Sequence, residues 1–178
     1  HIDLDVVIEL RVRPNHDVEV NMGPPQFEPA RIPFAAGARA PKYPLLVEGK
    51  ELEIGALSMG NPHAILRVNN TTRADVEHLG PLIEAHPDFP QRVNVGFMQV
   101  VSEREIRLRV YERGVGETLA CGTGACAAVV YGITRGWLRE FVTVSLAGGK
   151  LTVSWAGEGK PVIMTGPTAI VFEGTIKI

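Results

Sequence analysis

The sequence is poor in cysteine and has no long apolar run, which argues against a disulfide-stabilised scaffold and against a membrane-spanning protein. Its 178 residues include only two cysteines, Cys121 and Cys126, too few for a disulfide-stabilised scaffold. On one helix they would point about 140° apart and could not pair, so we expect two reduced thiols in a cytoplasmic protein. No apolar stretch approaches the roughly 18 residues of a membrane span, and no secretory leader is visible, so no membrane partner is expected.

Strong charge and several common site motifs are also absent. The formal net charge is -2, with no basic stripe, so nucleic acid is not an expected partner. There is no C-x-x-C or H-E-x-x-H for zinc, no G-x-x-x-x-G-K-[ST] for phosphate and no G-x-S-x-G nucleophile elbow. Residues 122–127 fit G-x-G-x-x-A, but the regular strand–helix alternation of a dinucleotide-binding fold is missing.

The segment Glu112–Gly136 organises the chain and reads E-R-G-V-G-E-T-L-A-C-G-T-G-A-C-A-A-V-V-Y-G-I-T-R-G. Two glycine-rich turns lead to Cys121, and a run of small apolar residues follows from Ala125 to Ile133. Because this run has hardly any polar face, it predicts a helix that is buried on all sides. Arg135 and Gly136 then form a typical C-terminal stop.

Most of the remaining chain has the alternation and the turn residues of strands, around one amphipathic helix at Asp75–Ala85. Strands are predicted at 2–12, 18–22, 45–57 as a hairpin, 64–68, 92–101, 105–111, 141–146, 151–155, 162–165 and 169–178. An apolar helix needs cover on every side. We therefore expect an α+β fold, in which a mixed, largely antiparallel sheet curves as a barrel around one central apolar helix, rather than a βαβ repeat.

Cys121 is the first candidate for chemistry because it lies at the predicted N-terminus of the apolar helix. The neighbouring amides of Gly122, Thr123 and Gly124 have no partner within the helix. Together with the helix dipole they favour a carboxylate ligand, and they favour thiolate over thiol at Cys121. A base or nucleophile with a depressed pKa is one interpretation. The other is a buried small hydrophobe.

Further candidates lie at turns and strand ends. Asn61 and His63 belong to a Gly-Asn-Pro-His turn between apolar strands, either as ligand groups or as a plain turn with a polar end cap. Asn94 interrupts an apolar strand, so its amide needs a structural partner or a ligand. Glu112 and Arg113 form a surface salt bridge, or the glycine turn that follows brings both to one site.

Several motifs resemble one known family. These are S-M-G-N-P-H at Ser58–His63, R-V-N-V-G-F at Arg92–Phe97 and E-R-G-V-G-E-T-L-A-C-G-T-G-A at Glu112–Ala125, with V-N-M-G-P-P at Val20–Pro25 and a terminal G-P-T-A-I-V-F-E-G. Their sequence and order are similar to those of the diaminopimelate epimerase family. Residues 1–17 are then a poorly matching lead-in strand, and residues 18–178 form one domain, the C-terminal lobe of such an enzyme.

The resemblance implies a cofactor-independent isomerase that interconverts LL- and meso-2,6-diaminopimelate in lysine and peptidoglycan precursor biosynthesis. A cysteine thiolate removes the α-proton, and a second thiol delivers a proton to the opposite face. The lobe with the family's other cysteine, in a C-G-N-G motif, is absent from this chain, and Cys126 cannot replace it. Since the chain also begins with His1, we expect a fragment or a processed product that is inactive alone.

By resemblance, the thiol end of the site consists of Cys121, the amides of Gly122 and Thr123, Glu112 and His63. Cys121 matches one of the two catalytic cysteines, and the two amides match those that hold the α-carboxylate and stabilise the developing carbanion. Glu112 matches a carboxylate near the substrate ammonium groups and the thiol. His63 lies close by, where it would tune protonation.

The opposite end of the site is implied by three further matches. Arg113 matches the residue that pairs with the distal carboxylate, for which a planar guanidinium is suited. Asn61 and Asn94 match amides that help to fix that end. The expected partners are the diaminopimelate substrate and the missing N-terminal lobe, and a homodimer is a further arrangement of this family. No cofactor or metal is expected.

Two other functions stay open. The first is another cofactor-independent racemase, acting on proline or hydroxyproline, although Arg113 with Asn61 and Asn94 favours a distal carboxylate that proline lacks. The second is a non-catalytic module that holds carboxylate ligands at the helix N-terminus.

Overall fold

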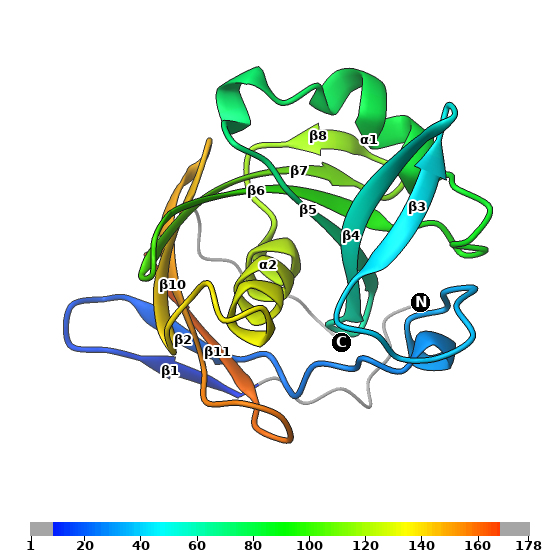
Figure 1. Ribbon diagram of the computed structural model, residues 1–178. Helices are drawn as coiled ribbons and strands as arrows, with labels where there is room; N and C mark the ends of the chain where they lie inside the picture. The colour runs from blue at the N-terminus through cyan, green and yellow to red at the C-terminus, as the bar shows by residue number, and fades with distance from the viewer. Residues whose placement is uncertain (1–8, 168–178) are drawn as a thin grey trace, which may run out of the picture.

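The computed structural model describes residues 9–167, which form a curved sheet around one central helix (Figure 1). In chain order the elements are β1 (Leu10–Val12), β2 (Val18–Asn21), η1 (Pro29–Arg31), β3 (Tyr43–Val47), β4 (Lys50–Ser58), β5 (Pro62–Arg67), η2 (Thr71–Arg73), α1 (Val76–Glu84), β6 (Asn94–Ser102), β7 (Glu105–Glu112), β8 (Gly116–Thr118), α2 (Gly122–Thr134), β9 (Phe141–Leu146), β10 (Gly149–Trp155) and β11 (Val162–Gly166). No helix in this part of the chain is long and apolar enough to span a membrane.

The strands form one mixed sheet in the order β1-β2-β11-β10-β9-β7-β6-β5-β4-β3, and β8 pairs with β7 outside this path. All pairs are antiparallel except β5–β6 and β7–β9. The predicted α+β fold with a largely antiparallel sheet is therefore confirmed. Both parallel pairs are joined through a helix, α1 in one and α2 in the other, and these two crossovers were not predicted.

Helix α2 is the apolar helix that the sequence predicts. Every residue from 124 to 132 is buried, and the helix packs against β4, β5, β6, β7, β10 and β11. It begins at Gly122, three residues earlier than the apolar run, with Cys121 as its N-cap. It ends where the sequence indicates, with Arg135 as C-cap and Gly136 in the left-handed region at φ 71°.

The predicted barrel is not closed by strand pairing within residues 9–167. The ends of the sheet, β1 and β3, do not pair with each other. The connection from β2 to β3 instead crosses the opening and meets β4 at one isolated bridge, Gln26–Ser58. This connection is rich in proline, which has no N–H to donate to a strand ladder, so it covers the opening without extending the sheet.

The outer face of the sheet carries a second core under α1. Val76 and Ile83 of α1 pack there with Phe89 and Phe97, all nearly inaccessible to solvent. Pro81 is accommodated inside α1. This second core fixes α1 and the turn after it against the sheet.

The strand predictions are confirmed in the described part of the chain, except that β8 was missed. Only Leu10–Val12 of the strand predicted at 2–12 is described, and the strand predicted at 169–178 lies outside the described residues. The boundary between residues 17 and 18 stays a prediction. β1 and β2 pair across it as a hairpin.

The contact between Gly55 and Tyr131 gives a test of how tightly the sheet holds α2. A Cβ on Gly55 would lie 2.3–2.6 Å from three atoms of the Tyr131 ring. Because the ring is rigid and packed in the core, Gly55→Ala should destabilise the fold by roughly 1–3 kcal/mol, measured as a lower Tm. Gly37→Ala is the control, since a Cβ there would meet nothing within 4 Å. Equal Tm values for the two variants would contradict this packing.

Candidate active site

The site is built around Cys121, where α2 begins beside the ends of three strands. Cys121 is 6% exposed, and no side chain in the described structure caps the helix. The amides of Gly122 and Thr123 therefore point out of the first turn without a partner in the helix. Gly124 leaves room for the thiol, because a Cβ there would lie 3.1 Å from Cys121 Sγ.

The electrostatic setting of the Cys121 thiol differs from the sequence prediction. Burial raises its pKa above the ordinary value, and the nearby Glu112 carboxylate raises it further. The backbone N–H of Gly124 and the hydroxyl of Thr123, 3.7 Å from Sγ, act in the opposite direction without overcoming burial. The prediction of a depressed pKa is therefore wrong for this chain: loss of solvent outweighs the helix N-terminus, and Cys121 rests as a thiol.

A hydrogen-bonded chain connects the thiol to the turn between β4 and β5. Asn61 Nδ2 donates to Thr123 Oγ1 at 3.3 Å, and Asn61 Oδ1 lies 2.9 Å from His63 Nε2. Because the Asn61 amide nitrogen points to Thr123, its oxygen accepts from His63, which assigns the proton to Nε2. Cys121 and Thr123 thus lie in one row with Asn61 and His63, although 62 residues separate Asn61 from Thr123.

His63 is held as a neutral imidazole. It is fully buried, and its Nδ1 has no hydrogen-bond partner in the described structure. Burial, together with the nearby positive charge of Arg113, lowers its pKa from 6.5 to about 3. Its Nε2 hydrogen bond holds the orientation of the Asn61 amide.

Asn94 and Arg113 are joined through the backbone. Asn94 is 4% exposed, and its Nδ2 donates to the Pro62 carbonyl at 3.0 Å, while its Oδ1 accepts the Arg113 backbone N–H at 3.0 Å. The structure thus uses this amide to join the start of β5 to the end of β7. The Arg113 side chain is exposed, donates to the Gln91 carbonyl at 3.0 Å and forms no ion pair within residues 9–167.

Glu112 turns toward the thiol rather than toward Arg113. It accepts a 2.5 Å hydrogen bond from the Thr118 hydroxyl and contributes to the electrostatics of Cys121. The alternative of a Glu112–Arg113 salt bridge is therefore excluded. All predicted site residues lie at one edge of the sheet, where β4–β5, β6 and β7 meet the N-terminus of α2.

Sequence reasoning missed two residues that support this edge. Thr118, on β8, holds the Glu112 carboxylate. Glu84, 5% exposed at the end of α1, accepts from the Gly114 backbone N–H at 2.9 Å and pairs with Arg92 at 3.2 Å, which fixes the turn that follows Arg113. The spacing of Glu84 four residues after Gly80 was the available signal, because it places the carboxylate on the buried side of α1.

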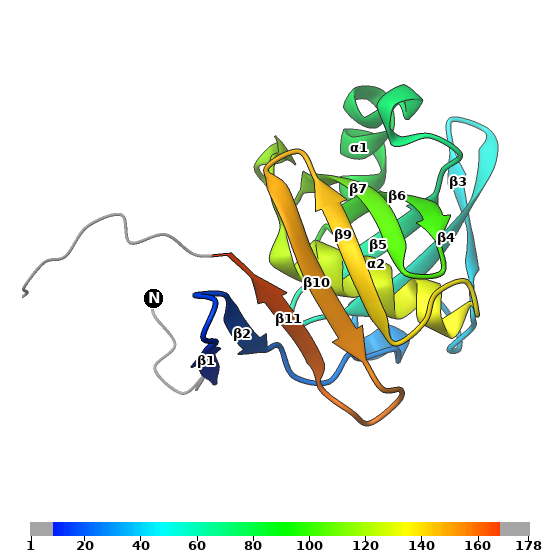
Figure 2. The same cartoon turned by 90° about the vertical axis from the view of Figure 1, so that its left-hand side faces the viewer.

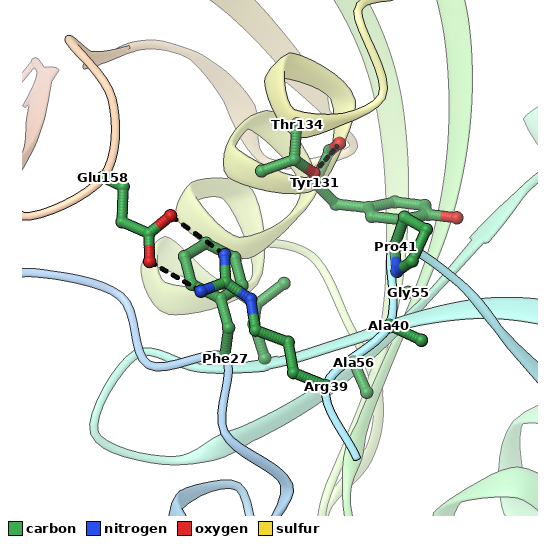
Figure 3. Close-up of a pocket in the computed structure, with 10 residues that line it drawn as sticks. Phe27, Arg39, Ala40, Pro41, Gly55, Ala56, Tyr131, Thr134 and Glu158 are labelled. Carbon is green, nitrogen blue, oxygen red and sulfur yellow. Dashed lines mark hydrogen bonds and ion pairs between the residues drawn. The ribbon is translucent and has the colours of Figure 1, made fainter.

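A cavity of about 470 Å³ lies at the opposite end of α2, but its charges are already paired (Figure 3). Arg39 and Glu158 form two hydrogen bonds of 2.6 and 3.0 Å across it, and the Arg39 guanidinium lies over the Phe27 ring. Tyr131 and Thr134, from the last turn of α2, line its wall. Within residues 9–167, no group of three His, Cys, Asp or Glu side chains could hold a metal.

Comparisons with known proteins cover the region that holds the candidate site. The diaminopimelate epimerase family model matches residues 55–171, which include every candidate residue of the site. The chain belongs to the diaminopimelate epimerase family. The resemblance carried by the sequence motifs is thereby confirmed, and with it the membership of a family of isomerases.

Curated relatives show how much of such a protein this chain represents. It is 64% identical to the diaminopimelate epimerase of Thioalkalivibrio sulfidiphilus over 173 residues and 57% identical to that of Stutzerimonas stutzeri over 172 residues. These matches cover 97% of the chain but 62% of each relative. The chain thus spans less than two thirds of the length of the proteins that it matches.

The fold has solved counterparts. A hydroxyproline epimerase from Agrobacterium vitis, solved with trans-4-hydroxy-L-proline bound, superimposes with a TM-score of 0.61 over 90% of this chain and 53% of that chain. The sequence identity is 17%, so this likeness supports the fold alone.

The buried neutral His63 predicts a pH-dependent stability. In the unfolded chain a histidine binds a proton near pH 6.5, whereas in the folded chain His63 stays neutral down to about pH 3. The unfolded state therefore binds more protons in this window, and stability falls as pH falls. The expected loss between pH 7 and pH 5 is roughly 2 kcal/mol.

Urea unfolding at both pH values of wild type, His63→Gln and His78→Gln tests this prediction. The pH-dependent loss should shrink in His63→Gln and persist in His78→Gln, which removes an exposed histidine. The same loss in all three proteins would show that His63 is protonated in the folded state.

Proposed function

We propose that this chain is part of a cofactor-independent diaminopimelate epimerase, which interconverts LL- and meso-2,6-diaminopimelate, and that Cys121 supplies one of its two thiols. The observation that carries the proposal is the position of Cys121. Its thiol lies at an uncapped helix N-terminus, in a hydrogen-bonded row with Thr123, Asn61 and His63. Membership of the diaminopimelate epimerase family supports diaminopimelate as the proposed substrate.

The amides of Gly122 and Thr123, which have no partner within the helix, suit the α-carboxylate of the substrate. A carboxylate bound there places Cα beside Cys121 Sγ, and its negative charge meets the positive end of α2. When the α-proton leaves, its electron pair delocalises into this carboxylate. The carboxylate carries more negative charge in the transition state than in the ground state, and the same amides stabilise that extra charge. This lowers the barrier to proton removal.

Proton transfer requires two thiols on opposite sides of Cα. A thiolate on one side takes the α-proton, and the thiol on the other side gives its proton to the carbanion, which inverts the configuration and leaves the second sulfur as thiolate. Cys121, whose pKa is raised, rests in the form that donates. The reverse direction uses its thiolate, which the Gly124 amide and the Thr123 hydroxyl stabilise.

The second thiol has to come from outside this chain. Cys126 is fully buried on the same helix, and burial raises its pKa to about 12, so it neither reaches the substrate nor ionises. We therefore expect the chain to be inactive alone and to complete its site with the lobe that its relatives possess beyond the matched region.

Hydrogen–deuterium exchange at the substrate α-carbon tests the assignment of Cys121. The chain is incubated with LL-diaminopimelate in deuterated water, alone and joined to the remaining part of the Thioalkalivibrio sulfidiphilus enzyme. We expect α-deuterium and meso product only in the joined protein. Cys121→Ala should lower turnover by about 10³-fold, since general acid–base groups supply about 10²–10⁴-fold. Cys126→Ala is the control and should retain turnover.

Other outcomes of this experiment count against parts of the proposal. Exchange without inversion by the chain alone would contradict its inactivity and leave Cys121 as a one-sided base. Full turnover in joined Cys121→Ala would remove Cys121 from the chemistry and favour the carboxylate-binding module.

Arg113 provides a test of substrate class. Its guanidinium forms no ion pair within residues 9–167 and is available for a distal carboxylate, while Asn94 fixes its backbone. In the joined protein, Arg113→Leu should weaken the binding of LL-diaminopimelate by about 10-fold to 100-fold, because a charge-assisted hydrogen bond is lost. The binding of L-lysine, which has the same skeleton without the distal carboxylate, should change little in this variant. Arg73→Leu is the control for loss of an exposed arginine. Equal weakening of both ligands by Arg113→Leu would favour a monocarboxylate substrate.

A further inference from the structure

Glu84, at the end of α1, is a buried carboxylate that the proposed reaction does not use. It is 5% exposed, whereas Glu77, the other acidic residue of this helix, is exposed. A carboxylate loses its hydration when it is buried, and it is retained where hydrogen-bond donors replace the water. The donors around Glu84 therefore indicate what this side chain does.

These donors belong to two segments that border the candidate site. The Gly114 backbone N–H donates to Glu84 Oε1 at 2.9 Å, and Arg92 Nη1 lies 3.2 and 3.4 Å from the two carboxylate oxygens. The backbone carbonyl of Glu84 also accepts the Val93 N–H at 3.1 Å. Glu84 thus connects the end of α1 to the loop before β6 and to the turn after β7.

Helix α1 is itself fixed on the sheet one helical turn before Glu84. Figure 2 shows α1 on the outer side of β6 and β7, across the sheet from α2. Gly80 lies so close to Tyr111 of β7 that a Cβ on Gly80 would be 2.6–2.9 Å from three atoms of the tyrosine side chain. Because Gly80 and Glu84 share one face of the helix, α1 holds the end of β7 at Tyr111 and the following turn at Gly114.

Arg113 lies between these two points of contact. Its backbone N–H donates to Asn94 Oδ1 at 3.0 Å, and its guanidinium donates to the Gln91 carbonyl at 3.0 Å. The next N–H along the chain, that of Gly114, is the one that Glu84 accepts. Gln91 belongs to the same loop before β6 that Glu84 holds. The contacts of Glu84 therefore fix both segments that determine where the exposed guanidinium lies.

We propose that Glu84 is a positioning residue for Arg113, and that it thereby sets the affinity of the site for the distal carboxylate of the substrate. The inference rests on the proposed function for the identity of that substrate. With its N–H bound, the turn at Gly114 is ordered before the ligand arrives, so binding does not have to order it. Without an acceptor this turn is free to change conformation, since Gly114 already lies in the left-handed region at φ 73°. Glu84 acts at the distal end of the site, so it should change substrate affinity rather than proton transfer.

Two uncharged variants separate the hydrogen bond from the charge and from the packing of Glu84. Glu84→Gln keeps an oxygen that accepts the Gly114 N–H, whereas Glu84→Met keeps the length and the helix propensity of the side chain without a strong acceptor. Both variants lose the ion pair with Arg92, so the difference between them reports the hydrogen bond to Gly114. Glu77→Met is the control for loss of a charge at an exposed position on the same helix.

The variants are made in the chain joined to the remaining part of the Thioalkalivibrio sulfidiphilus enzyme. The measured quantities are KM and kcat for LL-diaminopimelate and the inhibition constant of L-lysine. Glu84→Met should raise KM by about 10-fold, with kcat within about threefold of wild type and the L-lysine constant unchanged. Glu84→Gln and Glu77→Met should keep the wild-type KM.

A combination with Arg113→Leu tests whether Glu84 acts through Arg113. In the Arg113→Leu background, Glu84→Met should raise KM no further, because the group that it positions is already gone. The same increase of KM in both backgrounds, or an equal loss of affinity for LL-diaminopimelate and L-lysine, would show a merely structural role and overturn the proposal. An unchanged KM in Glu84→Met would also overturn it and leave the proposed function intact.

Hydrogen exchange of the Gly114 amide, followed by NMR in the chain alone, tests the positioning without turnover. Exchange should be slow in wild type and in Glu84→Gln and at least about 10-fold faster in Glu84→Met. Fast exchange in the wild-type chain would overturn the proposal even if Glu84→Met does not fold. A joined wild-type protein that is inactive on diaminopimelate, while Glu84→Met alone accelerates this exchange, would refute the proposed function and support the positioning of the turn by Glu84.

Discussion

Burial of α2 on all sides is the constraint on which the rest of the structure depends. Its small apolar residues offer no face to water, so the sheet has to curve around the helix from β4 to β11. That curvature brings the turn before β5, the start of β6 and the end of β7 to the N-terminus of α2. The first amides of α2 and Cys121 thus meet Asn61, Asn94 and Arg113 as a consequence of packing.

The same burial sets the protonation of the site. It raises the pKa of Cys121 and lowers that of His63, so both rest in their neutral forms. The charged groups, Glu112 and Arg113, stay at the edge, where Glu112 is half-buried and Arg113 is exposed. A neutral thiol beside free helix amides is suited to give a proton to a carbanion whose charge those amides stabilise.

The sequence could predict local features, such as a helix or a turn. It could not predict features that depend on how deeply a group is buried or on pairing between distant segments. The apolar pattern predicted helix α2, the Gly-Asn-Pro-His pattern predicted a turn, and the family motifs contain residues that the structure brings to one edge of the sheet. The parallel pairing of β5 with β6 and β7 with β9 joins residues far apart, and no local pattern encodes it. The direction of the Cys121 pKa shift was wrong because a sequence shows the helix end but not how deeply it is buried.

The pH dependence of Cys121 alkylation reports the balance between burial and the helix N-terminus at one atom. Mass spectrometry after iodoacetamide treatment follows Cys121 and Cys126 separately. We expect modification of Cys121 with a midpoint pH above that of a free thiol, and no modification of Cys126 below about pH 10, since burial raises the pKa of Cys126 to about 12. A Cys121 midpoint at or below that of a free thiol, or equal reaction of both cysteines, would contradict this expectation.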